Sequence, residues 1–207
     1  GQDIDGDLHN LLENAVAIDG NRIAVGAPRN TNVAYSAGRV RVYEWNGSLW
    51  TQVGASIPGK GAFECLGKDI SLDGNMLAVG GINYVSGVGA HPSFSYMRVY
   101  QWDGTMWGQL GGDFNSVGNG FDIGGCMDVD GNRVAVGIPY AKGDTGTAKV
   151  YEWDGTMWTQ LGQDLDGGTF RNAFGGTVSL QGSHLVVGAR EGATYNNQSF
   201  KVRVYRW

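Results

Sequence analysis

The chain contains one sequence pattern four times, and this repetition limits the folds that it can adopt. Consecutive Val-Gly pairs lie 54, 57 and 51 residues apart, beginning at Val25, Val79, Val136 and Val187. A recurring tryptophan keeps similar steps of 57, 51 and 54 residues, at Trp45, Trp102, Trp153 and Trp207. Two independent markers with similar spacing indicate four repeats, which we place at about 1–53, 54–110, 111–161 and 162–207.

Each repeat contains signals for four short strands. The first, such as 15–19 (AVAID), is apolar and ends at an Asp-Gly or Gln-Gly pair that favours a two-residue hairpin turn. The second, such as 22–26 (RIAVG), is almost entirely apolar, which indicates burial on both faces. The third, such as 39–45 (RVRVYEW), leads through another glycine turn to a short fourth strand. Four-stranded units of about 50 residues are typical of propeller blades, so we expect an all-β fold, a single β-propeller domain of four four-stranded blades.

Composition agrees with this fold class and excludes some partners. The 207 residues include 36 glycines and have a formal net charge of −5. Glycine at this level, with many Val, Tyr and Trp residues, is typical of short strands joined by tight turns. No basic stripe occurs, so we expect no nucleic-acid partner. No apolar run approaches the roughly 20 residues of a membrane-spanning helix, so we expect no membrane span.

One eleven-residue phrase appears three times, as EWNGSLWTQVG (44–54), QWDGTMWGQLG (101–111) and EWDGTMWTQLG (152–162). All seven tryptophans occupy the two repeat positions that flank its turn. A residue that recurs at the same strand position in every unit most simply packs one blade against the next. We therefore interpret the phrase as scaffold and not as a repeated chemical site.

A second set of motifs carries a family resemblance. Residues 174–175 (Phe-Gly), 187–190 (Val-Gly-Ala-Arg) and, in the first repeat, 25–28 (Val-Gly-Ala-Pro) resemble the FG-GAP repeats of secreted or surface microbial propellers and of integrin heads. The resemblance covers the whole chain and implies a propeller fold. It also implies an extracellular or cell-surface location and a non-catalytic binding or adhesion function.

The chain departs from this family at its calcium loops. Many members bind Ca²⁺ between the first two strands through a DxDxDG run, in which alternating carboxylates supply several oxygens to one cation. Here each turn keeps one carboxylate, at Asp19, Asp73 or Asp130, and the last repeat has Gln181. We therefore expect no calcium at these turns, and no metal or cofactor elsewhere.

Few residues suggest catalysis. The three histidines have no partner at metal-ligand spacing, and neither a nucleophile elbow nor a P-loop occurs. Two carboxylate pairs, Asp3 with Asp5 and Asp164 with Asp166, fit either a weak cation or acid–base site or a polar linker between blades. An enzyme with its site in the propeller mouth is thus a third choice, after a binding module and a lectin.

The variable loops give the main binding hypothesis. The loops after the second strands, 28–38, 82–96, 138–148 and 190–200, vary most and share one face of the predicted propeller. They contain tyrosines among Gly, Ser and Asn, a composition suited to recognition: Tyr35, Tyr84, Tyr140 and Tyr195. We expect a protein or glycan ligand on this face. The alternative is that each tyrosine covers the core beneath its loop.

The third strands give the lectin hypothesis. Alternation places a basic residue and a tryptophan on one face, as with Arg41 and Trp45 or Arg98 and Trp102, and such sets bind sugars in some propellers. The alternative is that each Arg stacks on a neighbouring Tyr between blades.

Two further features leave alternatives open. Cys65 and Cys126 are either small buried residues or a bridge between neighbouring repeats. The last repeat reaches Trp207, where its turn and fourth strand would follow. We expect its last blade to lack the outer strand unless another segment supplies it, and self-association through that edge.

Overall fold

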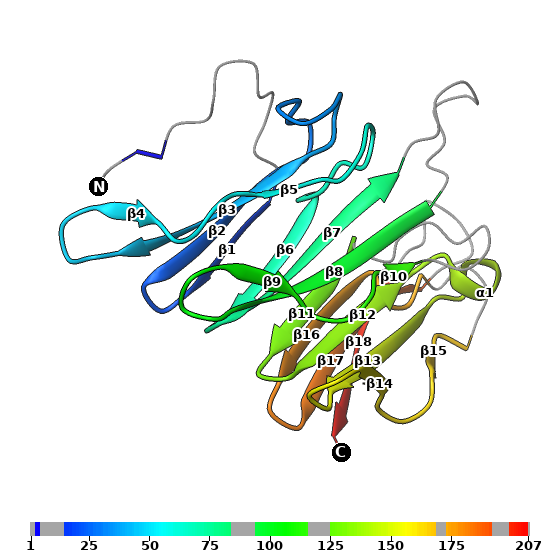
Figure 1. Ribbon diagram of the computed structural model, residues 1–207. Helices are drawn as coiled ribbons and strands as arrows, with labels where there is room; N and C mark the ends of the chain where they lie inside the picture. Colours follow the sequence, from blue (N-terminus) through cyan, green and yellow to red (C-terminus); the bar gives the residue numbers. More distant parts are fainter. Residues whose placement is uncertain are drawn as a thin grey trace.

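A computed structural model describes residues 3–4, 15–83, 94–115, 125–168, 173–191 and 199–206. This part of the chain is all-β, and its antiparallel sheets follow one another along the sequence, one per repeat (Figure 1). The first sheet contains β1 (Ala15–Asp19), β2 (Arg22–Ala27), β3 (Arg39–Trp45), β4 (Trp50–Gln52) and β5 (Ile57–Pro58). Strands β1 to β4 pair in sequence order, and β5 pairs with the beginning of β3.

The second and third sheets repeat this plan. The second contains β6 (Asp69–Asp73), β7 (Met76–Asn83), β8 (Phe94–Trp102), β9 (Trp107–Gln109) and β10 (Phe114–Asn115). The third contains β11 (Met127–Asp130), β12 (Arg133–Ile138), β13 (Thr147–Trp153), β14 (Trp158–Gln160) and β15 (Leu165–Asp166). The predicted four strands per repeat are thus present, and a two-residue strand follows each set.

The fourth sheet has three strands among the described residues: β16 (Thr177–Gln181), β17 (His184–Glu191) and β18 (Ser199–Arg206). The one short helix, α1 (Ala141–Asp144), is a turn with left-handed backbone at Lys142 and Gly143, where φ is 53° and 67°. No helix in this described part of the chain is long and apolar enough to cross a membrane.

The predicted hairpins at the Asp-Gly pairs are confirmed. The residues that flank each turn pair with each other, as Asp19 does with Arg22 and Gln181 with His184. The first turn residue has a positive φ, which glycine adopts without strain. These φ values are 52°, 53°, 57° and 55° at Gly20, Gly74, Gly131 and Gly182.

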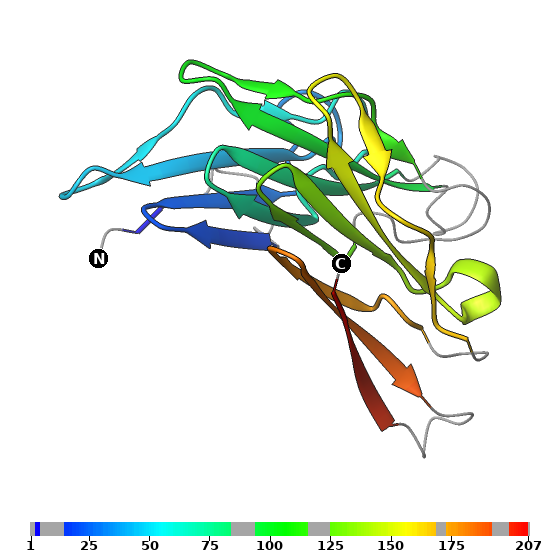
Figure 2. The ribbon, with the colours of Figure 1, turned by 90° about the horizontal axis from the view of Figure 1, so that it is seen from below.

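The four sheets form a series around a shared inner side. The first strands contact one another in order, β1 with β6, β6 with β11 and β11 with β16. Seen from below, the first sheet (blue) and the fourth (orange to red) bound the two ends of this series (Figure 2). The structure therefore shows an all-β repeated-sheet architecture with blade-like units.

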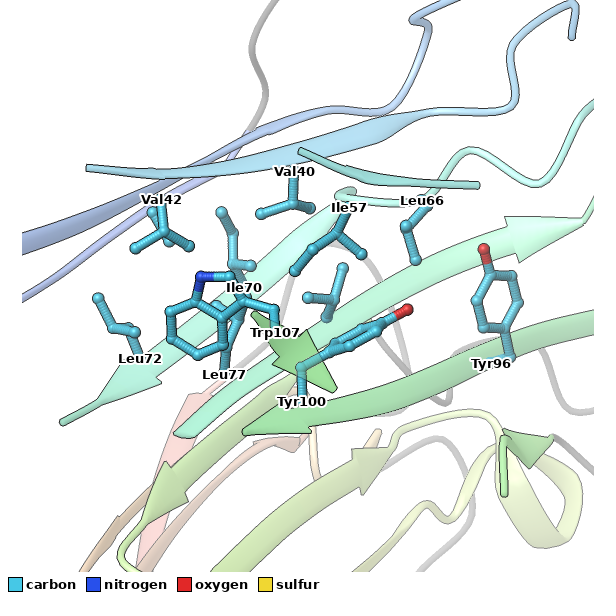
Figure 3. Close-up of a cluster of buried hydrophobic side chains, with 12 residues drawn as sticks. Val40, Val42, Ile57, Leu66, Ile70, Leu72, Leu77, Tyr96, Tyr100 and Trp107 are labelled. Atoms are coloured by element: carbon cyan, nitrogen blue, oxygen red, sulfur yellow. The ribbon is translucent and has the colours of Figure 1, made fainter. Parts of the chain in front are cut away.

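Apolar clusters fill the space between consecutive sheets. In the first, Val40 and Val42 of the first sheet meet Ile70 and Leu72 of the second, with Trp107 beside them (Figure 3). Two further clusters lie between the second and third sheets and between the third and fourth. Burial of both faces explains why the second strands read as nearly continuous apolar runs.

Close backbone contacts explain the glycines of the FG and GAP motifs. A Cβ added to Gly26 would lie 2.2 Å from the carbonyl oxygen of Gly67, and one added to Gly137 would lie 1.9 Å from that of Gly175. In each pair, one glycine (Gly26 or Gly137) is the last residue but one of a second strand. Its partner (Gly67 or Gly175) lies just before the first strand of the next sheet. These motifs therefore mark the places where consecutive repeats touch through their main chains.

The eleven-residue phrase is scaffold, as predicted. The Trp107 indole N–H donates to Val53 O at 3.2 Å, and the Trp158 N–H donates to Leu110 O at 3.0 Å, in each case reaching the preceding repeat. The acidic residue closes its own turn, since Asp103 Oδ1 accepts hydrogen bonds from the N–H groups of Thr105 and Met106. These backbone donors, with a threonine hydroxyl, hold the pKa of Asp103 below its usual value.

Candidate functional site

The main candidate site among the described residues is a pocket of about 440 Å³ where the third and fourth sheets meet, at the end that bears the variable loops. This volume falls within the range of about 300–1,000 Å³ that is usual for small-ligand sites. Residues of both repeats line it, including Cys126, Pro139, Tyr140, Arg190, Phe200 and Lys201.

The local fold places these side chains at the pocket. Pro139 follows the last residue of β12, and the turn that leads into α1 leaves Tyr140 46% exposed. Arg190 and Phe200 face each other across the β17–β18 ladder, and Phe200 is 80% exposed. The residues that line the pocket therefore include two accessible aromatic rings and two cations, of which Phe200 and Arg190 lie on one face of the sheet and Lys201 lies on the other.

The structure separates the four tyrosines that the sequence singled out. Tyr140 lines the pocket. Tyr35 is 67% exposed on the loop between β2 and β3, where its ring lies 5.2 Å from that of Phe63, and it does not line this pocket. Tyr84 and Tyr195 lie outside the described residues.

Sequence reasoning did not single out Arg190, Phe200 or Lys201. It assigned 190–200 to a loop, whereas β17 continues to Glu191 and β18 begins at Ser199. The available signal was the alternation of residues 201–205 (KVRVY), which continues backward through Phe200 and predicts a longer strand.

The residues proposed to bind sugar do not form an accessible site. Arg98 has a side chain only 3% exposed, and it pairs with Glu64 at 3.0 Å and Asp113 at 2.9 Å. Its guanidinium also lies 4.4 Å from the ring centre of Tyr96, whose hydroxyl donates to Glu64 O. Burial acts to lower the pKa of Arg98, but the two carboxylates outweigh it and raise that pKa above its usual value.

The neighbouring members of that set also make scaffold contacts. Arg41 lies over the ring of Tyr43, 5.6 Å from its centre. Trp102 packs on Trp107 with ring centres 5.5 Å apart, and an added Cβ on Gly54 would approach Trp102 to 2.6 Å. Trp45, at the exposed end of the series, is 36% exposed and packs on Trp50. These contacts match the alternative of packing between blades.

The carboxylates of the GQDLDG segment form ion pairs with lysines. Asp164 lies 3.1 Å from Lys149 Nζ, and Asp166 lies 2.7 Å from Lys142 Nζ. Burial acts to raise the pKa of Asp164, but hydrogen bonds from Gln160 and Lys149 outweigh it and lower that pKa. This geometry matches the polar-linker interpretation. Of the equivalent pair near the N-terminus, Asp5 lies outside the described residues.

The carboxylates of the Asp-Gly turns bind backbone N–H groups of the next repeat. Gly74 N donates to Asp19 Oδ2 at 2.7 Å, and Gly131 N and Gly182 N donate in the same way to Asp73 and Asp130. Within the described ranges, no group of three or more His, Cys, Asp or Glu residues has a geometry suited to a metal ion.

We therefore expect Asp73→Ala to lower the free energy of unfolding by about 1–2 kcal/mol, because it removes a charge-assisted hydrogen bond between repeats. Asp73→Asn retains an acceptor oxygen and should lose less. Thermal unfolding with and without millimolar Ca²⁺ checks the role of the turn. Stabilisation of the wild type by calcium that Asp73→Ala abolishes would instead establish a metal site.

Cys65 and Cys126 are not joined by a disulfide. Cys65 is buried, and burial raises the pKa of its thiol above the usual value. Cys126 lines the pocket.

A second pocket, of about 330 Å³, lies between the same two sheets, and its lining includes Val150, Leu161 and Tyr205. Leu161 has the repeat position of Val53 and Leu110, the residues that accept the indole hydrogen bonds of Trp107 and Trp158. We assign this space to the junction between repeats and not to a ligand.

Comparisons with known proteins support the fold alone. No protein-family model matches the chain, and no curated protein does. Among solved structures, the computationally designed Ika4 protein aligns over 100% of this chain and 98% of its own, with a TM-score of 0.53 and 14% identity. A xylan β-1,4-xylosidase from Bacillus halodurans C-125 aligns over 92% of this chain and 39% of its own, with a TM-score of 0.46 and 13% identity.

Proposed function

We propose that this chain is a non-catalytic binding module built of propeller blades, which acts outside the cell or at its surface. The observation that carries the proposal is the pocket on the variable-loop face, where Tyr140 and Phe200 lie close to Arg190 and Lys201. Loops on a rigid β scaffold are a common place for recognition. The scaffold here is rigid because each junction combines an apolar cluster with hydrogen bonds between repeats.

The lining chemistry favours a ligand that presents a ring or apolar face beside an acidic group. Aromatic side chains contribute large contact areas at low entropic cost, and a guanidinium can bind a carboxylate in two-point fashion. An acidic saccharide fits this description, so a lectin is the second candidate, with its site in this pocket and not on the third strands. The described lining residues contain no Asp, Glu or His, which favours binding over catalysis.

A glycan array with neutral and uronic-acid-bearing saccharides tests the proposal. For any saccharide that binds, we expect Tyr140→Ala and Arg190→Ala each to weaken binding by about tenfold, the effect of losing about 1.4 kcal/mol at one contact. Both side chains lie at the surface, so the melting temperature should change little.

Tyr35→Ala is the matched control, since this exposed tyrosine lies on the same face but outside the pocket. It should bind like the wild type. Equal losses for Tyr35→Ala and Tyr140→Ala would contradict the choice of pocket. If the chain bound only neutral glycans, and Arg190→Ala did not weaken that binding, the proposal of an acidic ligand would be contradicted.

A further inference from the structure

Consecutive sheets meet through the same two faces at each junction within the chain. We call the face toward the preceding repeat the leading face, and the face toward the next repeat the trailing face. At the first junction, Val40 and Val42 belong to the trailing face and Ile70 and Leu72 to the leading face. The equivalent residues at the next two junctions are Met97, Val99, Met127, Val129, Ala148, Val150 and Leu180, with the partly buried Val178 completing the third junction. Apart from Val178, all these side chains are at most 7% exposed.

The two ends of the series expose these same faces to solvent. On the leading face of the first sheet, Val16 and Ile18 are 75% and 71% exposed. On the trailing face of the fourth sheet, Val202 and Val204 are 66% and 65% exposed. In the repeat alignment these four positions correspond, in order, to Ile70, Leu72, Val40 and Val42. The chain therefore has both halves of a junction that it already forms three times, and neither half is covered.

Polar groups at the inner edge of the junctions match as well. Val129 N–H donates to Ser71 Oγ at 3.1 Å across the second junction, and Leu180 N–H donates to Asp128 Oδ2 at 2.8 Å across the third. Ser179 has the same position on the fourth sheet, where it is exposed and offers a hydroxyl acceptor. In a head-to-tail contact, the backbone N–H groups of β1 in the first sheet would be the donors to this hydroxyl.

Charges at the two ends are complementary too. In the third repeat, Lys149 on the third strand pairs with Asp164 of the GQDLDG segment at 3.1 Å. The matching basic residue of the fourth repeat is Arg203. The matching segment, GQDIDG, lies at the other end of the sequence and places Asp3 at the position of Asp164. Arg203 already donates to the carbonyl oxygens of Asp166 and Gly167, and a second copy of the chain would add a carboxylate at this position.

We propose that two copies of this chain associate head to tail, so that the trailing face of each fourth sheet covers the leading face of the other copy's first sheet. Both faces are exposed at the same time in one copy, so they do not cover each other within the chain. Propellers usually have about four to eight blades. Two copies of four sheets reach eight and close the ring, and closure removes the exposed ends that would otherwise build filaments. The argument does not use the ligand, but the two sites adjoin, because Val202 of the trailing face also lines the ligand pocket.

Light scattering coupled to gel filtration tests the assembly on the chain of 207 residues. We expect a particle of twice the 22.1 kDa chain mass at micromolar concentration, with a melting temperature that rises with protein concentration. Ile18→Asp on the leading face and Val204→Lys on the trailing face should each give monomers. Neither residue lines the ligand pocket, so glycan binding provides a separate readout of the proposed function.

Mixing the two variants distinguishes head-to-tail pairing from other modes. A mixed dimer has one junction with both native faces and one in which the two substituted side chains, of opposite charge, meet. An equimolar mixture should therefore recover the dimer mass. Met157→Asp is the matched control, because Met157 is an apolar side chain that is 59% exposed and lies on a turn outside both faces. This variant should stay dimeric.

Four outcomes would overturn the proposal. They are a monomeric wild type, an open series of larger assemblies, a dimer that survives both charge substitutions, and a mixture that stays monomeric. Circular dichroism of each variant confirms that its sheets are intact. A variant that does not fold would leave the mass of the wild type and the concentration dependence of its melting temperature as the deciding measurements.

Discussion

Replacing Arg98 with Met should lower the free energy of unfolding by about 3–5 kcal/mol, since removal of one partner from a buried ion pair leaves an uncompensated charge. The Arg98 side chain is 3% exposed, and its two carboxylate partners, Glu64 and Asp113, are 13% and 25% exposed. Methionine fills similar space but provides no charge and no donors. Denaturation by urea, followed by tryptophan fluorescence, measures the loss.

Arg133→Met is the matched control for this substitution. Arg133 pairs with Glu152 at 2.9 Å, but the two side chains are 27% and 35% exposed. Water and salt screen such a pair, so the loss should be about 1 kcal/mol or less. Similar losses for the two variants would show that burial does not set the strength of the Arg98 network.

The pH dependence of stability gives a second readout of the same network. Burial acts to raise the pKa of Asp113, but hydrogen bonds from Arg98 and Gln109 outweigh it, so the folded-state pKa lies below the unfolded one. The resulting stabilisation is complete above the unfolded pKa of about 4 and is lost as the pH falls through the folded value. Arg98→Met should therefore lose less stability than the wild type on acidification through this window.

Local sequence signals predicted most of the secondary structure. The Asp-Gly pairs fixed the hairpins because a two-residue turn depends on the backbone freedom of its own glycine. The apolar second strands and the recurring tryptophans located the sheets and the faces between them. These features depend on neighbours close in sequence, or on a period that the chain shows four times.

The sequence could not show which faces the neighbouring sheets cover. Alternation correctly placed Arg41 and Arg98 on equivalent faces, but Glu64, which pairs with Arg98, comes from an irregular segment with no strand signal. Its position depends on the bridge between Leu66 and Gly38, a contact between repeats. An arginine that looks suited to sugar binding is therefore part of the scaffold.

Only part of the pocket lining was named from the sequence. Tyr140 was singled out on a variable loop, and it lines the pocket. Arg190 and Phe200 come from strand ends that sequence reasoning assigned to a loop. Strand boundaries depend on pairing with the partner strand, which a single sequence does not reveal.

Gly137→Ala should lower the free energy of unfolding by about 3 kcal/mol, near the upper end of the usual cost of overpacking. The added Cβ would lie 1.9 Å from Gly175 O, and the atom it meets is main chain, which has no rotamer through which to move away. The backbone of Gly137 does not have a positive φ, so strain at residue 137 itself does not explain the loss.

Gly108→Ala is the matched control, because Gly108 also lies in a strand without a positive φ, and an added Cβ would meet nothing within 4 Å. It should leave stability unchanged or raise it by about 0.5–1 kcal/mol, since alanine reduces the entropy of the unfolded chain. The urea concentrations at the unfolding midpoints of the two variants and the wild type show whether the close contact causes the loss of stability. Equal midpoints would show that the close approach of Gly137 and Gly175 is not what requires glycine in this motif.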